Sequence, residues 1–143
     1  MNNAEQFVSE LFEEQNLMFV GSVDENGFPQ IRAMLLPRKC EGINEGIHII
    51  YFSTNTPTNK VRHFQNNRKA CVYFCDPVAF RGVLLTGTME VLEAQQYKKM
   101  LWEDGDELYY PGGVSDPNYC VLRFTAMEGR KYSNFQTENF IVE

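Results

Sequence analysis

The stretch FSTNTPTNKVRHF, residues 52–64, carries more polar side chains than a turn between two elements needs. A strand that ends here and a helix that follows require one N-cap and one favourable first residue, which Thr56 and Pro57 can supply. Capping alone leaves four polar side chains unexplained: Ser53, Thr54, Asn59 and Lys60. The other interpretation is that free amides at the helix start, with hydroxyls and an ammonium group, hold a phosphate.

Arg32 is a second candidate, because it lies in the otherwise mostly apolar strand PQIRAMLL. Strict alternation places it on the same face as Met34 and Leu36. Either its guanidinium reaches water at the rim of the sheet, or it points at the same anion as Lys60.

The remaining ionisable residues predict no metal site and no acid–base pair. His48 and His63 are interpreted as surface residues, one on the polar face of a strand and one on a helix turn. The carboxylates of EDGDE, residues 103–107, are interpreted as a solvated loop. No serine–histidine–aspartate order stands out, so no catalytic residue is assigned.

The loop YYPGGVSDPN, residues 109–118, has two interpretations. Its glycines and Pro117 can simply shape a turn. Alternatively, Tyr109 and Tyr110 can close over a flat ring, as aromatic stacking platforms do.

The composition predicts a single globular domain over residues 1–143. A hydrophobic fraction of 43% fits a folded core. The net charge of -6 and the absence of a long basic run argue against nucleic acid and anionic membranes as partners. No apolar run approaches the ~20 residues of a membrane span, and the acidic N-terminal segment does not fit a signal peptide. We therefore expect a cytoplasmic protein.

Four cysteines are expected to be reduced thiols, since none forms a Cys-x-x-Cys pair. Cys71 and Cys75 lie on one predicted strand, too far apart for a disulfide or a shared metal. The other two are Cys40 and Cys120.

The hydrophobic pattern predicts a mainly β (α+β) domain: an antiparallel barrel of six to seven strands with short peripheral helices. An open α+β sheet is the alternative, and long strands such as 82–92 favour closure because closure removes exposed edges. We expect a bend at Gly87, a hairpin at Asn26–Gly27 and a turn at Gly129. Helices are expected over 4–16, 56–68 and 94–102, and strands over 17–23, 29–37, 46–52, 70–75, 82–92, 119–127 and 130–135.

Three runs in order, IRAMLLP, IIYFSTNTPTNKVRHFQNNRKACVYF and RGVLLTGTMEVLE, resemble the pyridoxamine 5'-phosphate oxidase-like group of FMN-binding split barrels. Within this group the chain is most similar to short members labelled general-stress or nitroimidazole-resistance-like proteins. The resemblance extends from about Leu17 to Thr125. It implies a split β-barrel, FMN as the cofactor, and a homodimer with FMN between the subunits.

The resemblance also implies a set of cofactor-binding residues. Arg32 and Lys60 would hold the phosphate, and Ser53 and Thr54 would add contacts. The backbone of three consecutive residues would run beside the isoalloxazine: Ala33, Met34 and Leu35.

The chain departs from the family pattern at several positions. Asn59 stands where relatives have a second basic residue, and Gly82 stands where the oxidases have glutamine. Ser133 replaces a tryptophan of many short relatives, and no basic residue follows Lys131. These departures argue against pyridoxamine phosphate as the substrate.

The expected function is that of a flavin-dependent oxidoreductase acting on an unidentified small molecule. The alternatives are a flavin-binding protein without turnover, or the same barrel holding a deazaflavin or haem. Haem is disfavoured because neither histidine has an axial-ligand context. In the expected homodimer, Trp102, Tyr109 and Tyr110 cover the flavin of the partner; the alternative is that they pack on their own barrel.

Overall fold

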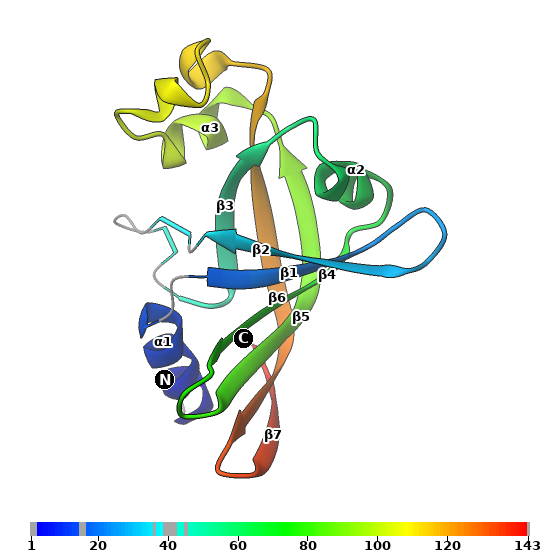
Figure 1. The fold of residues 1–143 in the computed structure, drawn as a ribbon, viewed down its shortest axis with the longest axis vertical. Helices are drawn as coiled ribbons and strands as arrows, with labels where there is room; N and C mark the ends of the chain where they lie inside the picture. The colour runs from blue at the N-terminus through cyan, green and yellow to red at the C-terminus, as the bar shows by residue number, and fades with distance from the viewer. Residues whose placement is uncertain (1–2, 15–16, 36, 39–42, 45, 143) are drawn as a thin grey trace.

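In a computed structural model of the chain, the structure describes residues 3–14, 17–35, 37–38, 43–44 and 46–142. Leu36 and Cys40 lie outside the described residues. Within them the chain forms seven strands, three α-helices and two 3-10 turns (Figure 1). In chain order these are α1 (Asn3–Glu14), β1 (Leu17–Val23), β2 (Pro29–Leu35), β3 (Ile49–Asn55), α2 (Asn59–Asn66), β4 (Lys69–Asp76), β5 (Arg81–Leu92), α3 (Gln95–Leu101), η1 (Asp106–Leu108), η2 (Gly113–Ser115), β6 (Tyr119–Ser133) and β7 (Gln136–Ile141).

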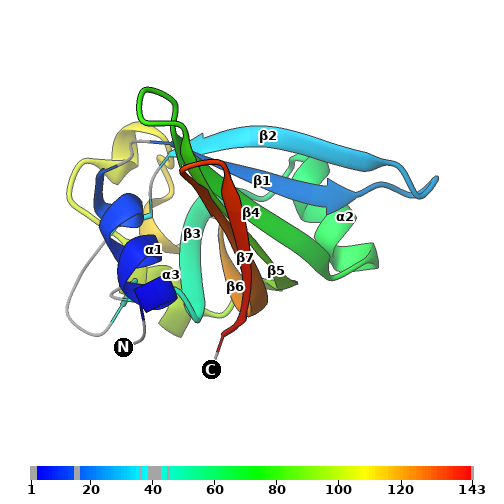
Figure 2. The ribbon, with the colours of Figure 1, turned by 90° about the horizontal axis from the view of Figure 1, so that it is seen from below.

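The strands form one antiparallel sheet in the order β2-β1-β4-β5-β6-β3, with β7 pairing on β6. Figures 1 and 2 show that this sheet curves strongly, so that β1 and β2 cross β3, β5 and β6 at a steep angle. Among the described residues the hydrogen-bonded path has two ends, β2 and β3. The curvature of this antiparallel sheet confirms the expected barrel in its split form. The barrel is not fully closed as the sequence analysis expected, because β2 and β3 do not pair with each other among the described residues.

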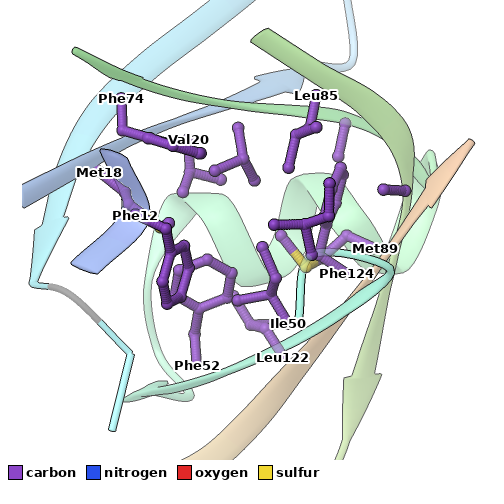
Figure 3. Close-up of a cluster of buried hydrophobic side chains, with 14 of the residues drawn as sticks. Phe12, Met18, Val20, Ile50, Phe52, Phe74, Leu85, Met89, Leu122 and Phe124 are labelled. Carbon is purple, nitrogen blue, oxygen red and sulfur yellow. The ribbon is translucent and has the colours of Figure 1, made fainter. Parts of the chain in front are cut away.

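The core lies inside the curved sheet, where alternate residues of each strand point inward. Figure 3 shows side chains from β1, β3, β4, β5 and β6 meeting there, with Phe12 of α1 closing one end. The ring of Phe12 contacts Phe74 edge-on, with centroids 5.9 Å apart. Fully buried members include Val20, Ile50, Phe74, Leu85, Met89, Leu122 and Phe124.

No helix among the described residues is long and apolar enough to span a membrane.

Helix α2 begins later than the sequence predicts. Its N-cap is Thr58 and not Thr56, and Pro57 precedes the helix. The reason is that the amide of Thr56 donates to the carbonyl of Asn118 at 2.8 Å, which continues the pairing of β3 with β6. The hydroxyl of Thr58 donates to the carbonyl of Asn55 at 2.9 Å, which stabilises the turn between β3 and α2.

The predicted turn at Gly129 is wrong, because β6 runs through this residue to Ser133. The turn lies instead at Asn134 and Phe135, with φ of 52° and 63°. Gly129 has a packing reason: a Cβ at this position would lie 2.3 Å from the ring of Phe140 on β7. The bend at Gly87 is confirmed, since the β5–β6 register shifts between Thr86 and Gly87.

Candidate functional site

A cavity of about 610 Å³ opens where the end of β2, the end of β3, the start of α2 and the η1 turn meet. Its walls combine apolar side chains, three tyrosines and two cations. The lining residues are Ala33, Met34, Leu35, Pro37, Arg38, Phe52, Ser53, Asn55, Lys60, Asp106, Tyr109, Tyr110 and Tyr119.

Arg32 is held against the neighbouring strand. Its Nη1 donates a hydrogen bond to the carbonyl of Val20 at 3.0 Å, directly across the β1–β2 register. The side chain is half-buried, and burial lowers the pKa of its guanidinium. Arg32 is therefore not a rim residue that simply extends into water.

Lys60, the second residue of α2, lies close enough to Arg32 for the two charges to interact. Its pKa is lowered mainly by burial, and in addition by the positive charge of Arg32. Among the described residues, neither cation forms an ion pair with a carboxylate. Two half-buried like charges repel, and an anion bound between them would remove this cost.

The end of β3 brings one hydroxyl to the cavity and turns the next away. Ser53 lines the cavity, and its buried Oγ makes no hydrogen bond of good geometry among the described residues, although it lies near enough to Tyr119 to act on the pKa of that hydroxyl. Thr54 points to the other face, as strand alternation requires, and is 7% exposed. Of the two hydroxyls predicted to contact a phosphate, the structure brings only Ser53 to the cavity.

Three consecutive residues of β2 that the sequence singled out, Ala33–Leu35, line the cavity together. Asn59 is not among the lining residues; it is exposed, and its Oδ1 accepts a bond from Arg62 at 2.9 Å. Gly82 does not line the cavity either. It lies on β5 under Tyr73, whose hydroxyl would be 2.5 Å from a Cβ at this position.

Three aromatic residues of the 102–119 segment, Trp102, Tyr110 and Tyr119, pack against one another within the subunit. Trp102 and Tyr110 both contact the buried Tyr119, with ring centroids 5.4 and 4.9 Å away. The hydroxyl of Tyr110 donates to Oδ1 of Asn55 at 2.6 Å. Burial raises the pKa of Tyr110 to about 12. Tyr109 also lines the cavity and is 77% exposed. Trp102 is not a lining residue, so this tryptophan supports the wall from behind.

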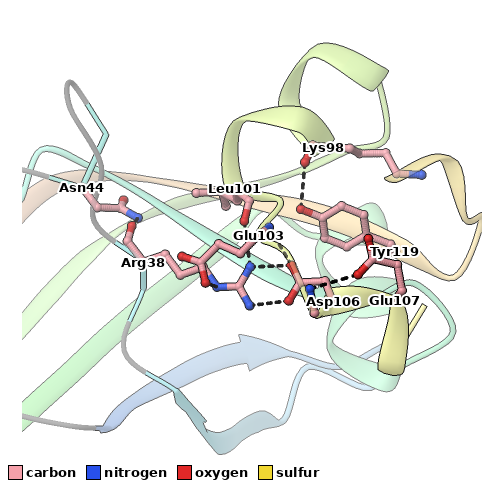
Figure 4. Close-up of polar contacts among 9 residues, drawn as sticks. Arg38, Asn44, Lys98, Leu101, Glu103, Asp106, Glu107 and Tyr119 are labelled. Atoms are coloured by element: carbon pink, nitrogen blue, oxygen red, sulfur yellow. Dashed lines mark hydrogen bonds and ion pairs between the residues drawn. The ribbon is translucent and has the colours of Figure 1, made fainter. Parts of the chain in front are cut away.

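Sequence reasoning missed Arg38 and Asp106, which line the same cavity as Lys60. Figure 4 shows the two side chains joined by two hydrogen bonds, of 2.6 and 2.8 Å. The bonds from Arg38 lower the pKa of Asp106, whose side chain is buried. The interpretation of Asp106 as part of a solvated loop is wrong. No local pattern could pair two charges 68 residues apart.

The assignment of His63 to the surface is also wrong, because the residue is only 7% exposed. It follows Val61 and precedes Phe64 on the inward side of α2, and its Nδ1 lies 2.9 Å from Oγ of Ser22. His48 is exposed, as expected. Within the part of the chain that the structure describes, no cluster of side chains could hold a metal, and Cys71, Cys75 and Cys120 are free thiols.

Comparison with known proteins identifies the family. A family model described as pyridoxamine 5'-phosphate oxidase matches residues 4–133. The chain belongs to the pyridoxamine 5'-phosphate oxidase-like family. A solved structure from Clostridium acetobutylicum, of a protein related to general stress protein 26 of B. subtilis, is 38% identical. The match has a TM-score of 0.83 and covers 99% of this chain and 97% of that chain.

Two more distant solved structures share the fold of this pyridoxamine 5'-phosphate oxidase-like protein. One is an FMN-binding protein from Nostoc punctiforme, 12% identical, with a TM-score of 0.72 over 100% of this chain and 98% of that chain. The other is a haem-binding protein from Mycobacterium smegmatis, 13% identical, with a TM-score of 0.74 over 99% of this chain and 59% of that chain. No curated protein matches the sequence significantly.

Proposed function

We propose that this protein binds FMN and acts as a flavin-dependent oxidoreductase on a small molecule. The observation that carries the proposal is that Lys60 lines the cavity together with Ser53, and that neither Lys60 nor Arg32 has a carboxylate partner among the described residues. Arg32 is not itself a lining residue, but its charge lowers the pKa of Lys60, so the two half-buried cations lie in one neighbourhood. Such a pair can donate charge-assisted hydrogen bonds to an anionic group, and the phosphate of FMN is a group of this kind.

The other donors and walls of the cavity fit the rest of the molecule. The unpartnered Oγ of Ser53 supplies a further hydrogen bond at the phosphate end. The volume of about 610 Å³ lies within the range of roughly 300–1,000 Å³ typical of cofactor and ligand sites. The β2 segment 33–35 offers an apolar edge along which a flat ring could lie.

In this proposal the chain binds and orients, while the cofactor supplies hydride or electron transfer when bound. Arg32 donates one N–H to the carbonyl of Val20, which fixes the direction of its guanidinium. Among the described residues, no side-chain hydrogen bond uses its other N–H groups, so they remain for an anion. Tyr110 stays neutral at physiological pH and holds the loop to Asn55. No acid–base side chain is assigned, because redox chemistry of this kind does not require one.

Haem is the alternative that the Mycobacterium smegmatis protein raises. We favour FMN because neither histidine lines the cavity: His63 is bonded to Ser22, and His48 is exposed outside it. An absorbance spectrum with mass identification of the bound molecule separates flavin, deazaflavin and haem in one measurement.

We also propose a cytoplasmic homodimer that shares its flavins between subunits. Outward-facing apolar residues on β1 and β2 are strongly exposed: Leu17 by 44%, Ile31 by 68% and Leu35 by 79%. Leu35 also lines the cavity, so a partner covering this face would cover the ring site as well. The free thiols agree with a reducing compartment.

The decisive experiment compares the dissociation constants of FMN and riboflavin for the purified protein. FMN should bind more tightly by at least about tenfold, since only FMN offers the phosphate that Arg32 and Lys60 would contact. Equal constants would mean that the two cations serve another purpose.

A further inference from the structure

A buried hydrogen bond joins α2 to the first strand of the sheet. Oγ of Ser22 on β1 lies 2.9 Å from Nδ1 of His63 on α2, and the two residues are 3% and 7% exposed. Among the side-chain hydrogen bonds of the described α2 residues, this one reaches a strand, whereas the bond between Arg62 and Asn59 stays within the helix. The proposed phosphate contacts do not use either residue directly.

A hydrolytic role for this pair is excluded by its surroundings. A nucleophilic serine must be reached by its substrate, and Ser22 is almost completely buried. The nearby carboxylate of Asp24 accepts bonds from the amides of Asn26 and Phe28 in the β1–β2 turn. Asp24 is therefore occupied by the turn, and the contact calls for a different explanation.

The same short segment of β1 supports both cations of the proposed site. The carbonyl of Val20 accepts the bond from Arg32, and Ser22, two residues further along the same face of β1, contacts His63. On α2, Lys60 precedes His63 by three residues, so the two side chains lie on the same side of the helix. Contacts to β1 therefore hold both Arg32 and, through His63, the helix that carries Lys60.

The two cations must be held in place by other contacts because they repel each other. The charge of Arg32 is felt at Lys60, and both side chains are half-buried. Val61 and Phe64 bury one side of α2, but apolar contacts are not directional. A hydrogen bond is directional, so the bond to Ser22 can fix the rotation and height of the helix.

We propose that Ser22 and His63 are positioning residues, whose hydrogen bond holds α2 so that Lys60 faces the same anion as Arg32. This inference rests on the proposed phosphate site. It predicts that the effect of losing the bond depends on Lys60, because without the ammonium group there is nothing left to position.

The test measures FMN affinity in four proteins: the unmodified chain, Ser22→Ala, Lys60→Ala and the double variant. Ser22→Ala should weaken binding roughly three- to tenfold in the unmodified chain. In the Lys60→Ala background the same change should cost less than about twofold, since coupled residues are not additive. His63→Asn, which keeps a polar group near the position of Nδ1, should retain most of the affinity.

Equal losses in both backgrounds, or no loss in the unmodified chain, would overturn the positioning role. If Ser22→Ala fails to fold, the comparison of His63→Asn with His63→Leu tests the positioning role instead. Equal affinity for FMN in these two variants would contradict that role. If the unmodified protein binds no FMN, the proposed function fails, and titration of the same variants with inorganic phosphate tests the positioning alone. A protein that binds neither FMN nor phosphate overturns both.

Discussion

Arg38 and Asp106 form a two-bond ion pair, with N–O distances of 2.6 and 2.8 Å, that ties the chain after β2 to the η1 turn across the cavity. Nη1 of Arg38 also donates to the carbonyl of Leu101, at the end of α3. Asp106→Asn should therefore lower the free energy of unfolding by about 1.5–3 kcal/mol, the range for hydrogen bonds to charged groups. Urea denaturation at neutral pH measures this loss.

The matched control is Glu103→Gln, because Glu103 also meets Arg38 but at 3.4 Å and with a side chain 59% exposed. An exposed pair of this kind is worth less than about 1 kcal/mol. The pKa of Asp106 is lowered in the folded protein, so its contribution is present above the unfolded pKa of about 3.9 and is lost as the pH falls through the folded value. The difference in the free energy of unfolding between the parent and Asp106→Asn should therefore shrink on acidification. A difference that stays constant with pH would show that the lost carboxylate charge is not the cause of the destabilisation.

Arg32→Ala and Lys60→Ala should each weaken FMN binding by about 1.5–3 kcal/mol. The control is Arg62→Ala, which removes an exposed cation from the same helix that is bonded to Asn59. Fluorescence titration of FMN compares the three variants. If Arg62→Ala weakens binding as much as Lys60→Ala does, a diffuse positive field accounts for the affinity, and the proposed phosphate site at Arg32 and Lys60 is wrong.

The affinity for FMN should fall at alkaline pH because of Lys60. Burial and Arg32 lower the pKa of this lysine, so in the free protein it loses its proton at a lower pH than an ordinary lysine. Only the ammonium form attracts phosphate, so affinity is constant from above the second pKa of the phosphate, about 6, up to the lowered pKa of Lys60, and it declines as the pH rises through that value. Lys60→Arg should remove this decline, because a guanidinium stays protonated. Identical pH profiles for the two proteins would exclude Lys60 as the titrating group.

The sequence predicted elements whose signals are local and missed contacts that depend on the fold. The β2 strand with Arg32 and the bend at Gly87 are readable from neighbouring residues. The start of α2 was placed two residues too early, because the pairing of Thr56 with Asn118 is not visible in the local sequence. Gly129 was misinterpreted because the ring that excludes a side chain there belongs to Phe140, on a strand the sequence did not predict.

At the candidate site, too, the residues with a local sequence signal were predicted and those that depend on distant contacts were not. The cations and the β2 edge were found, since they interrupt or follow an apolar pattern. Arg38 and Asp106 were missed because their partnership exists only after α3 and η1 fold back over the cavity. His63 was misplaced because its burial depends on Ser22, a residue 41 positions away.

Gly87→Ala should destabilise the protein by at least about 2 kcal/mol, because the added Cβ would lie 1.9 Å from the carbonyl oxygen of Thr125. The clash is with backbone at the β5–β6 register shift, so no side-chain movement can relieve it. Gly46→Ala is the control, since among the described residues no heavy atom beyond its two chain neighbours lies within 4 Å of a Cβ there. Thermal unfolding compares the two variants. Equal melting temperatures would mean that the register shift adapts without cost.

Ile31→Glu should convert the proposed homodimer into a monomer and lower its flavin content. Ile31 is 68% exposed on the outer side of β2, opposite Gly21 in the β1–β2 register, and a buried carboxylate there would lack a partner. Exposed apolar faces of this kind are rare on soluble monomers unless something covers them. Val78→Glu is the control: Val78 is 95% exposed at the β4–β5 turn and does not belong to β1 or β2, so this substitution should leave the dimer intact. Light scattering with flavin quantitation follows both variants, and a monomeric parent that keeps one tightly bound FMN would refute the shared site.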